Sequence, residues 1–121
     1  MTNRADLLRS LLRFDRPLSD LSAPLARFGW DSDRELATIE RAHVLAILGR
    51  YLSGEIQPPD VEDWANAIEG REDIGYERGH EDGLREVVYE LANPYLTRPL
   101  SVQSAKELMS CLSLGISPAA V

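Results

Sequence analysis

Residues 39–53, IERAHVLAILGRYLS, carry the clearest helical pattern in this chain. Their apolar side chains recur at spacings of three and four residues, which gathers them on one face of an α-helix. This apolar stripe consists of Val44, Ile47, Leu48, Tyr51 and Leu52. Gly54 follows, and glycine commonly ends a helix because it adopts the left-handed conformation without strain. We therefore expect a buried amphipathic helix here. Thr38 is a candidate N-cap, and the sequence leaves open whether the preceding ELAT, residues 35–38, joins the helix.

The same spacing recurs on both sides of this segment. Amphipathic helices are expected over 3–14, 60–69, 81–92 and 102–114, and a shorter helix over 19–28. The expected N-caps are Thr2 or Asn3, Asp60 and Ser101, and the expected stops are Gly29, Gly70 and Asn93-Pro94. Sustained alternation with period two is missing from the sequence, so a sheet of any size is not expected. The fold class predicted is all-α, with one compact domain over residues 1–121 and five or six helices.

Charge restricts the classes of partner. The chain has 121 residues, a length that fits one domain, and a formal net charge of −7. Nucleic acids and anionic membranes repel such a protein, since binding to phosphates requires clustered lysine and arginine. A basic protein is attracted instead. We expect a basic protein partner, with no nucleic acid and no membrane, and the sequence leaves the oligomeric state open.

The single cysteine, Cys111, excludes an intramolecular disulfide and a multi-cysteine zinc site. It lies beside the expected apolar stripe of the last helix, so we interpret it as a small buried hydrophobic residue. That stripe consists of Val102, Ala105, Leu108, Met109 and Leu112. The apolar runs fall well short of the ~20 residues that span a bilayer. The first residues, MTNRADLLRSLLRFDR, interrupt leucine pairs with charges, unlike a signal peptide. A cytoplasmic location is therefore expected.

A highly charged stretch, EGREDIGYERGHEDG at 69–83, separates two of the expected helices. Helix here would stack like charges, at about 0.2–0.5 kcal/mol each, and its four glycines would cost about 1 kcal/mol apiece. We expect a loop with a brief extended piece at 74–76, and helix again from about residue 80. Such a loop is a solvated connection, a metal site or a protein-binding surface. The spacing of its acids misses the calcium-loop pattern.

If the loop binds a basic protein, its acids and its tyrosine form the contact surface. The residues expected there are Asp73, Tyr76, Glu77, Glu81 and Asp82. A metal site would instead use oxygen and nitrogen ligands from Asp73, Glu77, His80 and Asp82. The sequence contains neither a catalytic motif nor a paired-histidine zinc spacing, so no cofactor or metal is assigned.

Three neighbouring segments carry a resemblance. They are GRYLSGEI at 49–56, DVEDWANAIEGREDIGYE at 60–77 and ELANP at 90–94. This pattern resembles a family of small bacterial proteins, some of whose members resemble immunity proteins of polymorphic or contact-dependent toxin systems. The resemblance implies a role in masking a cognate toxin, here a basic one, and it implies no catalytic residues.

Within that pattern, Trp64, Glu69 and Arg71 are expected to maintain the fold. Trp64 is placed on the inner face of its helix, with its ring N–H bonded to a carbonyl. Arg71 stands between Glu69 and Asp73, where a two-pronged ion pair would pin the loop to a helix end. Three functional classes follow from the sequence: a protein-binding immunity module, a structural or oligomerisation domain, and a metal-dependent enzyme. The first is the leading hypothesis.

Overall fold

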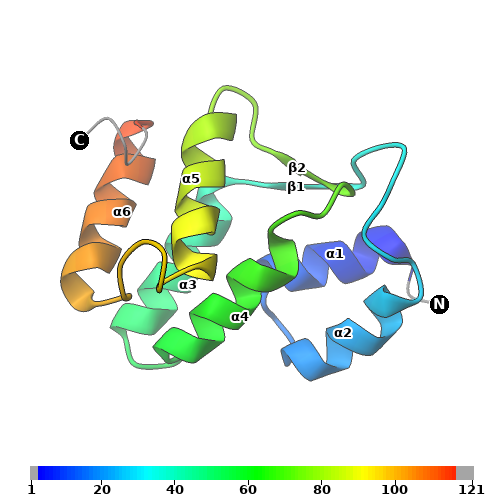
Figure 1. Ribbon diagram of the computed structural model, residues 1–121, viewed down its shortest axis with the longest axis horizontal. Helices are drawn as coiled ribbons and strands as arrows, with labels where there is room; N and C mark the ends of the chain where they lie inside the picture. The colour runs from blue at the N-terminus through cyan, green and yellow to red at the C-terminus, as the bar shows by residue number, and fades with distance from the viewer. Residues whose placement is uncertain (1–2, 117–121) are drawn as a thin grey trace.

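The computed structural model describes residues 3–116, and these are mostly helical (Figure 1). The described elements, in chain order, are α1 (Arg4–Arg13), α2 (Leu18–Ala26), β1 (Ala37–Ile39), α3 (Arg41–Leu52), α4 (Pro58–Ile68), β2 (Ile74–Tyr76), α5 (Glu81–Ala92) and α6 (Val102–Leu114). The prediction of an all-α fold with five or six helices is confirmed. The charged stretch at 69–83 is not helical until α5 begins, as expected.

Local signals place most helix ends correctly. Asn3 caps α1 by accepting a hydrogen bond from the backbone of Asp6, and Ser101 caps α6 in the same way through Ser104. Thr2, the alternative cap, lies outside the described residues. The start of α4 was placed wrongly: this helix begins at Pro58, two residues before the expected cap Asp60. The reason is that proline fits the first helical turn, where no N–H is needed.

The predicted N-cap of α3 was also wrong. Thr38 is not a helix cap, because it lies in the three-residue strand β1 and the N-cap of α3 is Glu40. β1 pairs in parallel with β2, with Thr38 opposite Gly75. The extended piece expected at 74–76 is thus confirmed as β2, and its partner strand was missed. Strands this short are too brief to show a periodic pattern.

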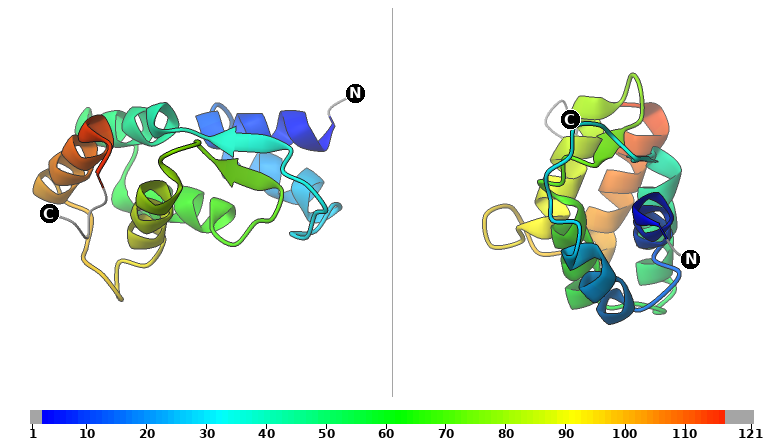
Figure 2. Two further views of the ribbon diagram at one scale, coloured as in Figure 1. Left: turned by 90° about the horizontal axis from the view of Figure 1, so that it is seen from above. Right: turned by 90° about the vertical axis from the view of Figure 1, so that its right-hand side faces the viewer.

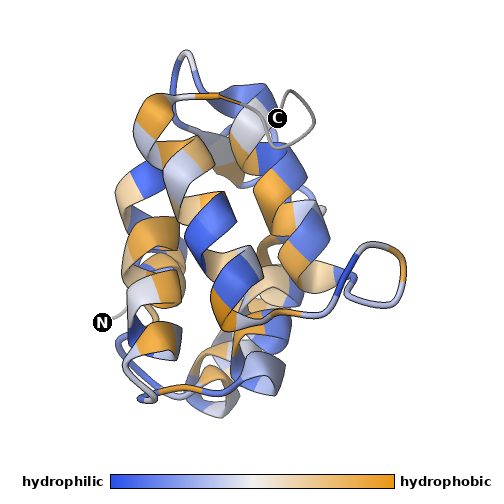
Figure 3. Ribbon diagram, turned by 90° about the vertical axis from the view of Figure 1, so that its left-hand side faces the viewer, coloured by the Kyte–Doolittle hydropathy of each residue, from blue (hydrophilic) through white to orange (hydrophobic). Residues whose placement is uncertain are grey.

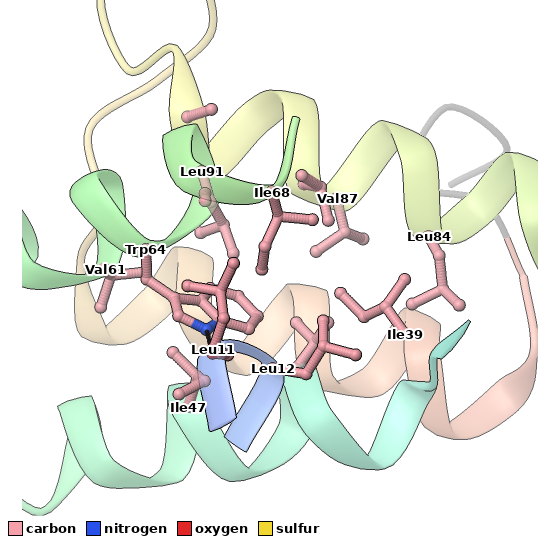
Figure 4. Close-up of a cluster of buried hydrophobic side chains, with 14 of the residues drawn as sticks. Leu11, Leu12, Ile39, Ile47, Val61, Trp64, Ile68, Leu84, Val87 and Leu91 are labelled. Atoms are coloured by element: carbon pink, nitrogen blue, oxygen red, sulfur yellow. Dashed lines mark hydrogen bonds between the residues drawn. The ribbon is translucent and has the colours of Figure 1, made fainter. Parts of the chain in front are cut away.

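The hydrophobic core lies between two layers of helices. In Figure 2, α4 and α5 form one layer and α1 and α3 form the other. Figure 4 shows side chains from both layers meeting around Trp64, whose ring is fully buried. Its Nε1–H donates to the carbonyl oxygen of Leu11 at 2.7 Å, which confirms the expected core role and the hydrogen bond. In α6, by contrast, Val102 is exposed rather than inward-facing, because it is the first residue of the helix and lies beyond the core.

The connection between α5 and α6 projects from the helical body. Figure 2 and Figure 3 show this loop, residues 93–101, extending on the side where α4 and α5 lie. Hydrogen bonds between residues close in sequence hold its base, since the backbone N–H of Leu96 and the hydroxyl of Thr97 both donate to the carbonyl oxygen of Asn93. Among the helices of residues 3–116, none has the length and apolar character needed to cross a membrane.

Candidate protein-binding face

The first residue expected on the contact surface, Asp73, is completely buried. Its carboxylate accepts hydrogen bonds from Arg71, with Nε–Oδ1 at 2.9 Å and Nη2–Oδ2 at 3.0 Å. Arg4 adds a third bond, with Nε–Oδ2 at 2.8 Å. Burial opposes ionisation of Asp73, but the two arginines outweigh it and hold the pKa of the carboxyl below its ordinary value. Placing Asp73 on a binding surface was therefore wrong, because no part of it reaches solvent.

The buried ion pair of Arg71 and Asp73 has the structural job predicted for Arg71. Arg71 also donates to the carbonyl oxygen of Gly29 at 3.0 Å, and its guanidinium lies 4.8 Å from the ring centre of Trp30. The network joins the start of β2 to the loop before β1, and through Arg4 to the first turn of α1. Glu69 takes no part in it, since its carboxylate instead accepts a hydrogen bond from the side-chain amide of Asn93 at 3.2 Å.

Two further residues predicted for the contact surface instead interact with other parts of the protein. Glu77 accepts from the Nη2 of Arg41 at 3.0 Å and from the backbone N–H of the same residue at 2.8 Å, which fixes the start of α3. These hydrogen bonds from Arg41 lower the pKa of Glu77. Tyr76 is half-buried beneath the guanidinium of Arg85, 4.5 Å from the ring centre, and burial raises the pKa of its hydroxyl. Both residues chiefly support the fold.

The last two, Glu81 and Asp82, are exposed in the first turn of α5. Glu81 accepts a hydrogen bond from the backbone N–H of Gly79 at 2.8 Å. Acids in this position also interact favourably with the positive end of the helix dipole. The structure therefore separates the five predicted contact residues, and the two that remain available to a partner both belong to α5.

The negative charge of the protein is concentrated on α4 and α5. Together these helices contain seven acids and one arginine, a formal net charge of −6, against −7 for the whole chain. That leaves thirteen of the twenty acids and twelve of the thirteen basic residues for the rest of the protein. Figure 1 shows α4 and α5 crossing each other, and these two helices pack together extensively. We call the exposed surface of these two helices the acidic face. Its acids do not all point the same way: Glu62 and Glu90 line one pocket, Asp60 and Asp63 adjoin the connection between α1 and α2, Glu81 and Asp82 line a cavity beside α6, and Glu86 lies on α5.

The spacing of these acids works against helix stability. Asp82, Glu86 and Glu90 follow one another at intervals of four residues on α5, so their carboxylates lie on one side of the helix. Like charges at this spacing each destabilise a helix by about 0.2–0.5 kcal/mol. The Nε of Arg98 relieves part of this repulsion by binding Glu90 at 3.0 Å. α4 contains no basic residue at all. The repulsion along α5 is thus unfavourable for the isolated helix, whereas the acids in the first turns of α4 and α5 are favourably placed. The excess of acids on both helices favours contact with a cation.

Exposed apolar side chains lie next to the acidic face. Tyr95 is 98% exposed and Leu96 is 72% exposed in the projecting loop, and Tyr89 of α5 is 46% exposed. A pocket of about 370 Å³ opens between this loop, the end of α5 and the start of α4. Its apolar lining consists of Pro58, Pro59, Val61, Leu91, Pro94, Tyr95, Pro99 and Leu100, and its charged lining of Glu62, Glu90 and Arg98. Aromatic residues beside such a pocket are typical of protein interfaces.

The sequence interpretation missed this part of the surface. One signal was present: in NPYLTRPL, residues 93–100, an apolar pair stands between two prolines, outside any helical pattern. Proline prevents the stretch from joining either neighbouring helix, which leaves Tyr95 and Leu96 without a core position. What the sequence did not reveal is that the start of α4 lies beside this loop.

The residues proposed as metal ligands are not gathered together. Asp73 and Glu77 pair with arginines, whereas His80 and Asp82 both line a different, smaller cavity of about 210 Å³. Cys111 lines that cavity too and is almost fully buried, as expected. Within residues 3–116, no three histidine, cysteine or acidic side chains are grouped closely enough to hold a metal ion.

Comparison with known protein families, with curated proteins and with solved structures finds no match for this chain. The acidic face is therefore assigned from its charge, its exposed apolar residues and its pocket.

Proposed function

We propose that this protein is a protein-binding module that captures a basic protein through the acidic face of α4 and α5. The observation that supports this most directly is that two packed helices hold a net charge of −6 while the rest of the chain is nearly neutral. Negative charge carried by two adjacent helices steers an oppositely charged partner toward them and raises the association rate. Dispersed charge would serve solubility equally well without favouring any orientation.

The role that we propose for this capture is the neutralisation of a basic toxin in the cytoplasm, which is what an immunity protein does. A basic toxin that acts on nucleic acid needs clustered lysine and arginine to bind the phosphates of its substrate. An acidic face competes for that same cluster, so it blocks the toxin without needing any catalytic group of its own. The pattern at 49–56, 60–77 and 90–94 resembles a mostly uncharacterised family of small bacterial proteins, and the immunity-like members of that family are the reason for proposing this role.

The exposed aromatic residues are expected to slow the dissociation of the complex. Electrostatic steering mainly speeds the encounter, whereas buried aromatic anchors slow dissociation. Tyr89 and Tyr95 stand within the acidic surroundings, where a partner drawn in by charge would cover them. Charge and apolar contact therefore act at successive stages of binding on one surface.

The test begins with capture of partners from the native host, followed by mass spectrometry and purification of the basic protein retained. Association rates are then measured against ionic strength for the wild type and for the triple variant Glu62→Gln, Asp63→Asn and Asp82→Asn. The matched control removes three exposed acids elsewhere, through Asp20→Asn, Asp31→Asn and Asp33→Asn, and has the same net charge.

We expect the face variant to associate about tenfold more slowly at low salt and to show a flatter salt dependence, because screening acts on exposed charges. The control variant should stay close to the wild type. Equal slowing of both variants would mean that only net charge matters, and unchanged rates in both would contradict the proposed function. Protection of host cells against the captured protein should fall with the association rate.

A further inference from the structure

We propose that the pocket between α4, α5 and the projecting loop receives an apolar side chain from a basic amphipathic helix of the partner. This inference rests on the proposed function and adds to it the anchoring point and the kind of segment that binds there. The argument comes from the shape of the pocket, from the charges that line it and from the loop that stands beside it.

The pocket is apolar and built from restrained backbone. Val61 and Leu91, which are buried, form part of its lining, so one side of it is continuous with the hydrophobic core. Four prolines make up half of the apolar lining: Pro58, Pro59, Pro94 and Pro99. Because each proline has a fixed φ angle, this lining loses little conformational entropy when a ligand binds. A volume of about 370 Å³ lies at the lower end of the range found for pockets that bind small molecules, which leaves room for one large side chain.

The charged residues of the lining specify what should accompany that apolar group. Glu90 is already paired with Arg98 at 3.0 Å. Glu62 is not so paired, since none of the ion pairs between residues 3 and 116 includes it. A lysine or arginine one helical turn from the inserted side chain would meet Glu62. Alternating apolar and basic residues at spacings of three and four is the pattern of a basic amphipathic helix.

The loop supplies contact area around the pocket. Tyr95 and Leu96 project from a base that hydrogen bonds to Asn93 hold in place, so they are presented to solvent by an ordered turn. Large apolar residues so exposed lose no core packing when a partner covers them. They also gain burial worth about 25 cal/mol per Å² of apolar area.

Charge decides between a foreign helix and a second copy of this protein. Two copies meeting through this surface would bring together two pairs of helices that each carry a net charge of −6, and juxtaposed like charges oppose association. A basic helix satisfies the same surface without that repulsion. The pocket, the acidic residue beside it and the exposed loop therefore all favour one occupant, a cationic helix with an apolar stripe.

The test uses two synthetic peptides of equal length and equal lysine content. One places leucine at positions i, i+3, i+4 and i+7, and the other has glutamine at those positions. Binding of each is measured by calorimetry to the wild type, to the double variant Tyr95→Ser/Leu96→Ser, and to Glu62→Gln. Leu114→Ser on α6 is the matched control, because Leu114 is 73% exposed and Leu96 is 72% exposed.

We expect the leucine peptide to bind the wild type at least tenfold more tightly than the glutamine peptide. The double variant should lose that difference while binding the glutamine peptide unchanged. Glu62→Gln should weaken both peptides, and Leu114→Ser should affect neither. Sedimentation of each variant at increasing concentration accompanies these measurements.

Equal affinity of the two peptides for the wild type, or a leucine advantage that survives in the double variant, would overturn the pocket assignment. So would the absence of binding by both peptides. Self-association abolished by Tyr95→Ser/Leu96→Ser would show that the occupant is a second copy. The charge-steered capture is tested separately, by comparing the association rates of the triple acid variant and its matched control with the natural partner.

Discussion

The indole N–H of Trp64 in α4 donates a 2.7 Å hydrogen bond to the carbonyl oxygen of Leu11 in α1, 53 residues earlier in the chain. This carbonyl lies in the last turn of α1, where oxygens lack a complete set of helical partners. The backbone N–H of Phe14 also donates to it, at 3.0 Å. Trp64 thus fills the core with its ring and completes the end of another helix with its polar edge.

Replacing Trp64 should reveal both contributions. Trp64→Ala is expected to lower the free energy of unfolding by about 3–5 kcal/mol, because a large buried ring is lost and a cavity remains. Trp64→Phe should cost clearly less, since most of the ring volume stays and the Leu11 carbonyl keeps its bond from Phe14. Urea denaturation followed by circular dichroism measures both values. Near-normal stability of Trp64→Ala would contradict the core assignment.

The buried Asp73 should dominate the response of stability to substitution of charged residues. Asp73→Asn leaves Arg71 and Arg4 without their shared counter-ion, and loss of one partner from a buried pair typically costs about 3–5 kcal/mol. Asp33→Asn, at an exposed position, is the control and should change the stability by less than about 0.5 kcal/mol. Chemical denaturation at neutral pH distinguishes the two outcomes.

The pH dependence of that difference has a definite sign. The folded-state pKa of Asp73 is lower than its ordinary value of 3.8, so the folded protein binds this proton less readily than the unfolded chain. The stability contributed by the carboxylate is therefore fully present above the ordinary pKa and is lost as pH falls through the folded pKa. The stability gap between wild type and Asp73→Asn should stay constant from pH 7 to about pH 5 and shrink below pH 3.8. A gap that closes already near neutral pH would contradict this.

Two glycines of the charged stretch should respond differently to alanine. Gly79 has a φ of +86°, so a side chain there is strained, and Gly79→Ala should cost about 1–2 kcal/mol although nothing lies nearby. Gly75 has no such backbone constraint, and the three atoms nearest to an added methyl group all belong to the carboxylate end of Glu35. Because Glu35 is exposed, it can rotate away, and Gly75→Ala should cost less than Gly79→Ala. Thermal denaturation of the two variants provides the comparison, and the reverse order would show that Glu35 is held in place.

Removing acids from α4 should separate stability from binding. Glu62→Gln and Asp63→Asn are expected to change the free energy of unfolding by no more than about 0.5 kcal/mol each, because neither carboxylate has an ion-pair partner among residues 3–116. The same substitutions should weaken capture of the basic partner. Parallel measurements of unfolding and binding test this separation, and a large loss of stability would mean that these acids serve the fold.

Much of the helical framework could be predicted from local sequence. Asn3, Ser101 and the glycines after the helices act within a few residues of their own position, so their effect is visible in the sequence itself. The candidate binding site was harder to predict from local sequence. Asp73 and Asp82 look alike in the charged stretch, yet one is buried between two arginines and the other is exposed on α5.

What the sequence determined by itself is the amphipathic pattern of the helices, the break at 69–80 and the excess of acidic residues. Tertiary structure alone decided that β1 exists, because a three-residue strand forms only when β2 is beside it to satisfy its backbone groups. It also decided which acids remain available, since Arg4 reaches Asp73 and Arg41 reaches Glu77 only after distant segments have come together. Helix periodicity follows from contacts between residues three or four apart, whereas ion pairs, pockets and charged faces depend on residues that chain folding brings into contact.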